Sequence, residues 1–159
     1  SADYSYTNND LQCVDTINDR YVLAHLDMDV SSVTGRLSYC VTPEMSLQVY
    51  AMPYVAAGRY TNFREVVAPR ADAYADRFAS YDYLTANSNP DFNFKEMRSN
   101  VVFRWEWSSG STLYLVWSRG AIDSEDGRGA FDAGRDFDRL LSASGDNAFM
   151  IKISKWLSI

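Results

Sequence analysis

The strongest constraint in this sequence is the placement of short turns and long connections between its strand-like segments. Two tight turns, TPEM at Thr42–Met45 and SSGS at Ser108–Ser111, each separate segments in which apolar and polar residues alternate. Long polar stretches, residues 59–95 and 121–146, follow these hairpins. If successive strands alternate in direction, both turns lie at one end and both long stretches at the other. This asymmetry is typical of an outer-membrane β-barrel and is not expected of an ordinary soluble sheet.

The alternating segments have the period of two that characterises β-strands. In the clearest segment, Phe103 and Trp105 share one face, whereas Arg104 and Glu106 lie on the other. The alternating residues Ala2–Thr7 predict the end of a further, truncated strand. The remaining predicted strands cover residues 33–41, 47–56, 113–118 and 149–157.

The parity of the apolar positions predicts the register of both hairpins. Apolar residues occupy odd positions on both sides of each turn, and opposed residues share a face, so the numbers of paired residues must sum to an even value. This predicts three-residue loops over residues 43–45 and 109–111. Gly110 would supply the positive φ that such a loop requires.

The long connections contain two segments that we expect to be helical. Phe137, Leu140 and Leu141 follow the i, i+3, i+4 spacing of an amphipathic helix over residues 133–144. A second short helix is predicted over residues 71–80.

These patterns predict an all-β chain, an antiparallel up-and-down transmembrane β-barrel segment of about five to six strands with short helices in long outer loops. Residues 1–159 form a single region, the C-terminal portion of the barrel, with a loop or truncated strand at 1–19 and barrel strands and outer loops at 20–159. So few strands cannot close a barrel, so we expect the missing strands to come from upstream sequence or from another chain. The alternative is a soluble β-sandwich, in which the apolar face would be the core.

The alternation also predicts which side chains meet lipid and which face the lumen of the barrel. Aromatic residues near a membrane boundary form girdles, and Trp107 beside its turn fits such a place. The predicted lipid-facing residues are Leu37, Tyr39, Val49, Phe103, Trp105, Trp107, Leu113, Leu115, Trp117, Phe149, Ile151 and Ile153. The predicted lumen-facing residues are Arg36, Gln48, Arg104, Glu106, Tyr114 and Lys152.

Composition argues against several classes of function. The net charge of -6 comes without a cluster of basic residues, so we do not expect nucleic acid as a partner. The single histidine, His25, is too little for a convergent catalytic set, so we assign no catalytic residue, do not expect an enzyme, and expect no cofactor. The alternative source of a hydrolase site would be the loop carboxylates Asp123, Asp126, Asp136 and Asp138. We assign no metal site. The residues that could contribute ligands to one are His25, Asp27, Asp29, Asp123 and Asp126.

The two cysteines test the predicted topology. Cys13 precedes the first complete strand on the outer side, and Cys40 lies just before a turn on the periplasmic side. Strands that cross a membrane separate these positions by much more than the span of a disulfide. We therefore expect them not to be bonded.

Three runs carry a resemblance to a known family: TPEMSLQVYAMPYVAAGRYTNFRE, DFNFKEMRSNVVFRWEWSSGSTLYLVWSRG and FDAGRDFDRLLSASGDNAFMIKISKWL. In this order they resemble the C-terminal barrel region of large bacterial outer-membrane proteins, the domain-of-unknown-function family 5916. In that family, a domain similar to family-nine carbohydrate-binding modules precedes the barrel. The resemblance extends from about Arg20 to the C-terminus, and RWEW with GSTLYLVW is its most specific part.

The resemblance implies a location in the bacterial outer membrane and a barrel architecture, so we expect outer-membrane lipid as a partner. The alternation of strand directions, with both tight turns on the periplasmic side, then places the C-terminus in the periplasm. Our first hypothesis is a structural role, in which the chain closes a barrel that passes or binds a solute or polymer. The alternatives are a carbohydrate-binding β-sandwich, soluble or at the cell surface, and part of a carbohydrate-active hydrolase whose catalytic residues lie outside this chain. The chain departs from the family at Lys155, where an aromatic residue is usual, and at its terminal Ile159.

Overall fold

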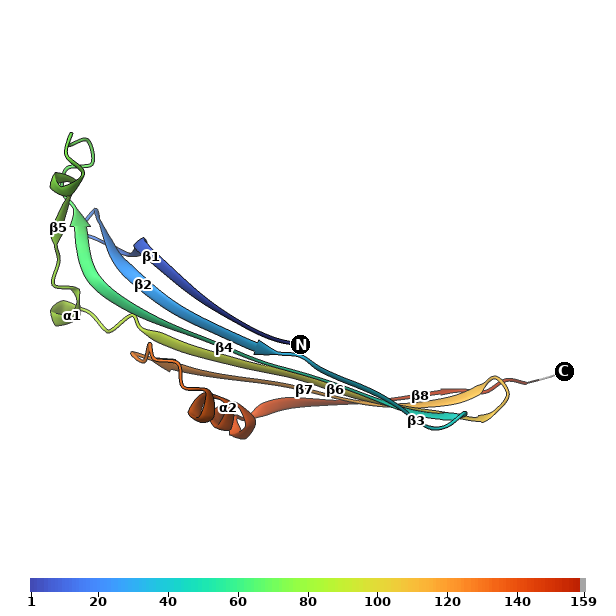
Figure 1. The fold of residues 1–159 in the computed structure, drawn as a ribbon. Helices are drawn as coiled ribbons and strands as arrows, with labels where there is room; N and C mark the ends of the chain where they lie inside the picture. Colours follow the sequence, from blue (N-terminus) through green and yellow to red (C-terminus); the bar gives the residue numbers. More distant parts are fainter. Residues whose placement is uncertain (158–159) are drawn as a thin grey trace.

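The computed structural model describes residues 1–157, and these residues form one open antiparallel sheet with a long, curved shape (Figure 1). The order of the sheet in this part of the chain is β1-β2-β4-β6-β7-β8, and β3 and β5 both pair with β4. The strands are β1 (Ala2–Ile17), β2 (Arg20–Val33), β3 (Gly35–Thr42), β4 (Met45–Val66), β5 (Phe78–Ser80), β6 (Phe92–Ser108), β7 (Ser111–Asp126) and β8 (Gly145–Ser154). The predicted all-β, antiparallel class is confirmed, and the sheet is not closed.

Strands β2 and β3 act as one long strand that is interrupted at Thr34. Strand β2 pairs with the second half of β4, with Ser32 opposite Tyr54, and β3 pairs with its first half, with Gly35 opposite Ala51. Strand β4 has 22 residues, which at ~3.3 Å per residue gives a length of roughly 70 Å. The sheet is therefore a meander of long neighbouring strands, and β1 extends well beyond the short segment that the sequence predicted.

A β-bulge beside each tight turn accounts for the register of the hairpins. Thr42 pairs with Met45, but Cys40 pairs with Ser46, so the register shifts between Cys40 and Thr42. The same shift occurs in the hairpin at residues 106–112. The predicted three-residue loops are therefore wrong, because the extra residue lies in the strand rather than in the turn. The predicted even sums are confirmed beyond the bulges.

The two ends of the sheet differ in their connections. The end that we call the turn end carries the turns at residues 43–44 and 109–110, where Gly110 has the expected positive φ of 74°. The opposite end, the loop end, carries the connections at residues 67–91 and 127–144. It also carries one tight turn that the sequence did not predict, at Asn18 and Asp19, whose φ values of 48° and 60° fit a hairpin turn.

The strands continue into the stretches that the sequence predicted to be long polar loops. Strand β4 runs to Val66, β6 begins at Phe92, and β7 runs to Asp126. Backbone pairing continues in these stretches. The apolar alternation is absent there because charged side chains occupy positions on one face of this half of the sheet. The loops are therefore shorter than predicted.

One of the two predicted helices is confirmed. Helix α2 covers Ala133–Ser142, and the Asp132 side chain caps its N-terminus. The helix predicted over residues 71–80 is wrong, because β5 forms there by pairing with the end of β4, next to a 3-10 turn at Tyr74–Arg77. Helix α1 (Tyr83–Ala86) follows it. Among residues 1–157, no helix is long and apolar enough to cross a membrane.

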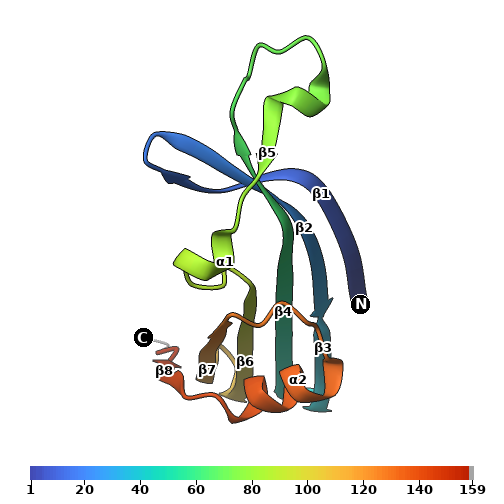
Figure 2. The same cartoon turned by 90° about the vertical axis from the view of Figure 1, so that its left-hand side faces the viewer.

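The loop end has its own covering elements. Figure 2, which shows the molecule from this end, places α2 across the strands, and α2 contacts β4, β6 and β7. The 67–91 connection covers a small core on β2 and β4 that contains Val22, Ala24, Phe63 and Tyr83. The rings of Phe63 and Tyr83 stack there with their centroids 5.0 Å apart. The loop end is thus packed by residues of this chain.

Candidate functional site

The main candidate site is one face of the sheet at the turn end, which we call the apolar band. Along a row of paired residues, every side chain points to the same face of the sheet. Tyr39 is 58% exposed and Ile151 is 68% exposed, although both belong to a continuous sheet. The band consists of the rows Met45, Trp105, Leu113 and Ile153; Tyr39, Leu47, Phe103, Leu115 and Ile151; and Leu37, Val49, Val101, Trp117 and Phe149.

The register places the predicted lipid-facing residues other than Trp107 on this one face. Trp107 lies in the bulge next to the turn, and its ring packs against that of Trp105 with the centroids 6.3 Å apart. Trp117 lies at the other margin of the band, where its Nε1 donates to Asn147 Oδ1 at 3.0 Å. The band therefore carries tryptophans at both of its margins.

The predicted lumen-facing residues lie on the opposite face. Arg104 is opposite Tyr114, which is opposite Lys152. The Arg104 guanidinium donates to Glu106 at 2.5 Å. Arg36 lies over the ring of Tyr50 at 5.3 Å. This face is therefore polar at intervals, although Val102, Val116 and Met150 form an apolar row within it.

Arg119 marks the limit of the apolar band toward the loop end. It pairs with Asn147, one row beyond Trp117 on the same face. Its guanidinium donates to the carbonyl oxygen of Ala143 at 2.8 Å, just after the end of α2. Helix α2 therefore begins to cover this face where the apolar side chains end.

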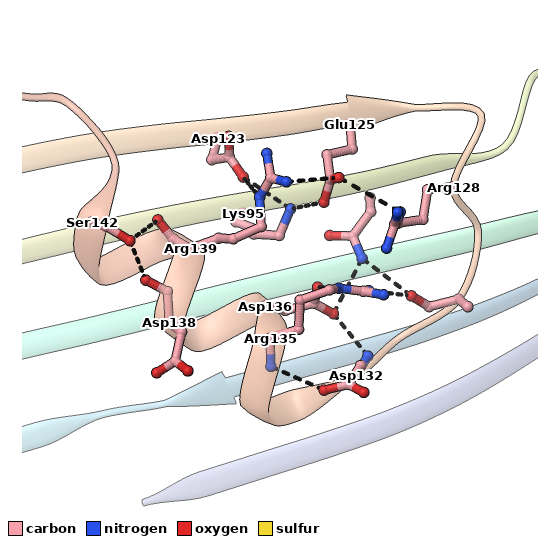
Figure 3. A network of polar contacts seen from close by, with 12 residues as sticks. Lys95, Asp123, Glu125, Arg128, Asp132, Arg135, Asp136, Asp138, Arg139 and Ser142 are labelled. Atoms are coloured by element: carbon pink, nitrogen blue, oxygen red, sulfur yellow. Dashed lines mark hydrogen bonds and ion pairs between the residues drawn. The ribbon is translucent and has the colours of Figure 1, made fainter.

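Under α2 lies an ionic network around Lys95, whose side chain is fully buried (Figure 3). Its Nζ donates to Asp123 at 3.0 Å and to Glu125 at 3.1 Å. Arg139 of α2 donates to the same two carboxylates, at 3.1 Å and 2.9 Å. The Arg139 guanidinium, together with Lys95, holds the pKa of the Asp123 carboxyl below its ordinary value. The network therefore joins α2 to β6 and β7.

A second part of this network surrounds the fully buried Asp136. Its Oδ2 accepts from the backbone N–H of Asp132 at 2.8 Å and from the Asn93 amide at 3.1 Å, and Arg135 donates to its Oδ1 at 2.8 Å. Burial alone would raise the pKa of the Asp136 carboxyl, but these donors outweigh it and the pKa is lowered. Asn93 Oδ1 is buried without a hydrogen-bond partner.

The network suits an anchor better than an active site. Asp123 and Asp136 are both held by cations and hydrogen bonds, so neither is available as a base. Asp126 lies on the opposite face, since it is three residues from Asp123 on the same strand. Asp138 lies on α2 and is exposed. The loop carboxylates therefore do not converge.

The candidates on β2 lie on one face, as their spacing predicted, and they bind side chains of β1. His25 Nδ1 lies 2.6 Å from Asp10 Oδ1, and this contact raises the pKa of His25. Tyr4 donates to Asp29 at 2.5 Å, and Tyr6 donates to Asp27. Within residues 1–157, no group of three or more His, Cys, Asp or Glu residues is arranged to hold a metal ion. These side chains instead tie β1 to β2.

Sequence reasoning missed the network around Lys95, although a signal for it was present. Asn93 and Lys95 share the parity of the apolar positions on β6, and Asp123 and Glu125 share it on β7. The even-sum rule would have placed all of them on one face. Helical periodicity alone could not show that α2 would return to this face.

The cysteines lie far apart, at opposite ends of the sheet. Cys40 pairs with Ser46, whereas Cys13 pairs with Leu23, which is opposite Arg64. Between Ser46 and Arg64, β4 covers roughly 60 Å at ~3.3 Å per residue. Both cysteines are exposed and free, which confirms the prediction that they are not bonded.

The model of a family described as a domain of unknown function (DUF5916) matches residues 1–158. The chain belongs to this family. The resemblance seen in the sequence is thereby confirmed at the level of the family. No curated protein and no solved structure was found to match the chain. The apolar band and the ionic network both lie within the region that the DUF5916 model matches, so they are features of a chain of this family.

Proposed function

We propose that this DUF5916 chain is the C-terminal segment that closes a β-barrel in the bacterial outer membrane. The apolar band faces lipid, and the opposite face lines the lumen. The turn end lies in the periplasm together with the C-terminus, and the loop end lies outside the cell. The barrel binds or passes a solute or polymer along the lumen face.

The observation that carries this proposal is the exposure of the apolar band. Soluble monomers rarely expose contiguous apolar patches larger than a few hundred Å². Here two adjacent rows of apolar side chains cross β3, β4, β6, β7 and β8, and a third row beside them crosses β4, β6, β7 and β8. Lipid is the natural environment for such a surface, because its removal from water is favourable.

Further features of the sheet support this proposal. Membrane strands need about 9–11 residues, and β8 has 10. Tryptophans at the margins of the band correspond to the aromatic girdles of membrane barrels. The band stops where Arg119 and α2 begin, which fits a boundary between lipid and water.

A soluble β-sandwich that binds carbohydrate is the second candidate. It would need another sheet over the apolar band, and a second copy of this chain could supply one. This candidate predicts a dimer in plain buffer with its tryptophans shielded. Binding of carbohydrate would then use side chains outside the buried band.

Fluorescence quenching separates the two candidates. The chain is placed in vesicles whose lipids carry bromine on their acyl chains, and emission is compared with that in unbrominated vesicles. We expect strong quenching, because Trp105 and Trp117 lie on the apolar band. Trp117→Phe and Trp105→Phe should each reduce the quenchable emission.

The contrary result is equally clear. If the chain is soluble in plain buffer, and neither brominated lipid nor acrylamide quenches its tryptophans, the band is covered by protein and the membrane assignment fails. A glycan-binding screen on that soluble form would then test the second candidate.

A further inference from the structure

We propose that the free edge of β3 accepts an antiparallel strand of about eight residues that lies in line with β1. This inference rests on the proposed barrel for the apolar character of the incoming strand. The position and register of that strand follow from the backbone alone.

The edge of β3 is uncovered along its whole length. In the described residues, β3 pairs with β4 and with no other strand, whereas β2, its continuation, lies between β1 and β4. All residues of β3 are exposed, and Leu37 and Tyr39 are each 58% exposed. An unpaired row of backbone N–H and C=O groups is a template for another strand.

The ladder between β1 and β2 leads directly into this edge. Ala2 is opposite Val33. One position further, the Ser1 amino group donates to the carbonyl oxygen of Thr34 at 2.9 Å, and the Thr34 N–H donates to the carbonyl oxygen of Ser1 at 2.8 Å. Gly35, the next residue, begins β3. Figure 1 shows the N-terminus at this junction, beside the start of β3.

The register then specifies the chemistry of the incoming strand. The β1 ladder fixes a constant offset, so a strand in line with β1 would place alternate side chains beside Leu37, Tyr39 and Val41. These positions belong to the face of the apolar band and require apolar residues. The intervening positions lie beside Arg36 and Cys40 and suit polar or small residues.

The length of the site favours this occupant over a second copy. The free edge has 8 residues and stops at Ser1, which already holds Thr34. Strand β8, the other free edge in this half of the sheet, has 10 residues. A β8 strand from another copy would extend past the edge and meet β1. A strand that continues β1 fits the available space.

The test adds such a strand to the chain itself. A Thr-Val-Thr-Val-Thr-Val-Thr-Val extension is fused before Ser1, which places its valines beside Leu37, Tyr39 and Val41. The matched control carries one Gly between the extension and Ser1, which reverses its faces. Both proteins are compared in detergent with the unextended chain by hydrogen exchange of the β3 amides and by the rate at which a maleimide labels Cys40.

We expect the in-register extension to slow the exchange of the β3 amides roughly tenfold and to slow the labelling of Cys40, with little change in the control. Equal protection by both extensions, protection by neither, or protection of β8 instead would overturn the proposal. These readouts do not depend on lipid, so failure here is distinct from failure of the brominated-lipid experiment.

Discussion

The two halves of one sheet face differ in what covers their side chains. At the turn end the face carries the apolar band, and residues such as Phe149, 77% exposed, have no covering element within residues 1–157. At the loop end the same face carries the charged side chains of Lys95 and Asp123, and α2 covers them. The loop end is therefore covered by an element of its own chain, whereas the apolar band is covered by no element in the described part of the chain.

This difference indicates which interactions stabilise each half of the sheet. A buried cation such as Lys95 is tolerated only because it is paired and hydrogen-bonded, so the loop end depends on internal electrostatics. No element within residues 1–157 covers the apolar band, and under the proposed function lipid covers it. Mutations in the two halves should therefore respond differently to the solvent.

The largest effect is expected at the buried cation of the loop end. Lys95→Met removes the ammonium and leaves Asp123 paired with Arg139, and Glu125 paired with Arg139 and Arg128. Breaking a buried ion pair in this way should lower the free energy of unfolding by about 3–5 kcal/mol. Urea unfolding in detergent measures it, with the midpoint and slope recorded together.

Lys152→Met is the matched control, because Lys152 is exposed on β8. We expect a change below about 0.5 kcal/mol. If both variants lose the same stability, the network is not what holds α2 to the sheet, and the contrast between the two halves loses its energetic basis.

The second prediction concerns the apolar band. Ile151→Arg places a charge on the band, whereas Met150→Arg places the same charge on the opposite face of the same strand. In lipid vesicles we expect the first variant to lose about 2–4 kcal/mol and the second much less. The two sites are similarly exposed, at 68% and 58%, so exposure alone cannot explain a difference.

Reversible unfolding in vesicles measures this pair, and the same pair in plain detergent provides the comparison. Equal losses for Ile151→Arg and Met150→Arg in lipid would mean that lipid does not distinguish the two faces. The assignment of the band to the membrane would then be abandoned.

The turn-end half was predictable from sequence because its apolar and polar side chains alternate between the two faces of each strand. Alternation through Phe103 and Trp105 indicated the strand, its faces and the parity of its register. The bulges were not predictable, because an even sum is satisfied equally by a longer turn or by an extra residue in the strand. The hairpin at Asn18 and Asp19 was missed, although two residues tolerant of positive φ are a known turn signal.

The loop-end half was less predictable because its partners are distant in sequence. Lys95 and Arg139 meet only because α2 returns across the sheet, which a local pattern cannot indicate. The sequence predicted loops there because apolar and polar residues do not alternate. Backbone pairing nevertheless continues to Val66 and Asp126. Where pairs of charged side chains replace apolar contacts, the hydropathy pattern no longer indicates a strand.

The third prediction sharpens the role of α2 in covering the loop end. Asp132 Oδ1 accepts from the backbone N–H of Arg135 at 2.9 Å and caps the helix. Asp132→Ala should cost about 1 kcal/mol, whereas Asp132→Asn, which keeps a cap, should cost less. Hydrogen exchange of the α2 amides checks the order of the two variants. Equal exchange in both would show that the cap does not hold the helix in place.

The smallest effect is expected where β1 meets β2, because the contact of His25 with Asp10 there only adds to the backbone ladder and to the packing of β1 residues against the loop-end core. The contact with Asp10, 2.6 Å from His25, raises the pKa of His25, so the protonated form is favoured in the folded state. Its stabilisation is fully present below the ordinary pKa of about 6.5 and is lost as the pH rises through the folded value. Exchange of the β1 amides near Asp10, corrected for intrinsic rates, should therefore become faster through this range. His25→Gln should remove the pH dependence, and a dependence that survives in this variant would assign it to another group.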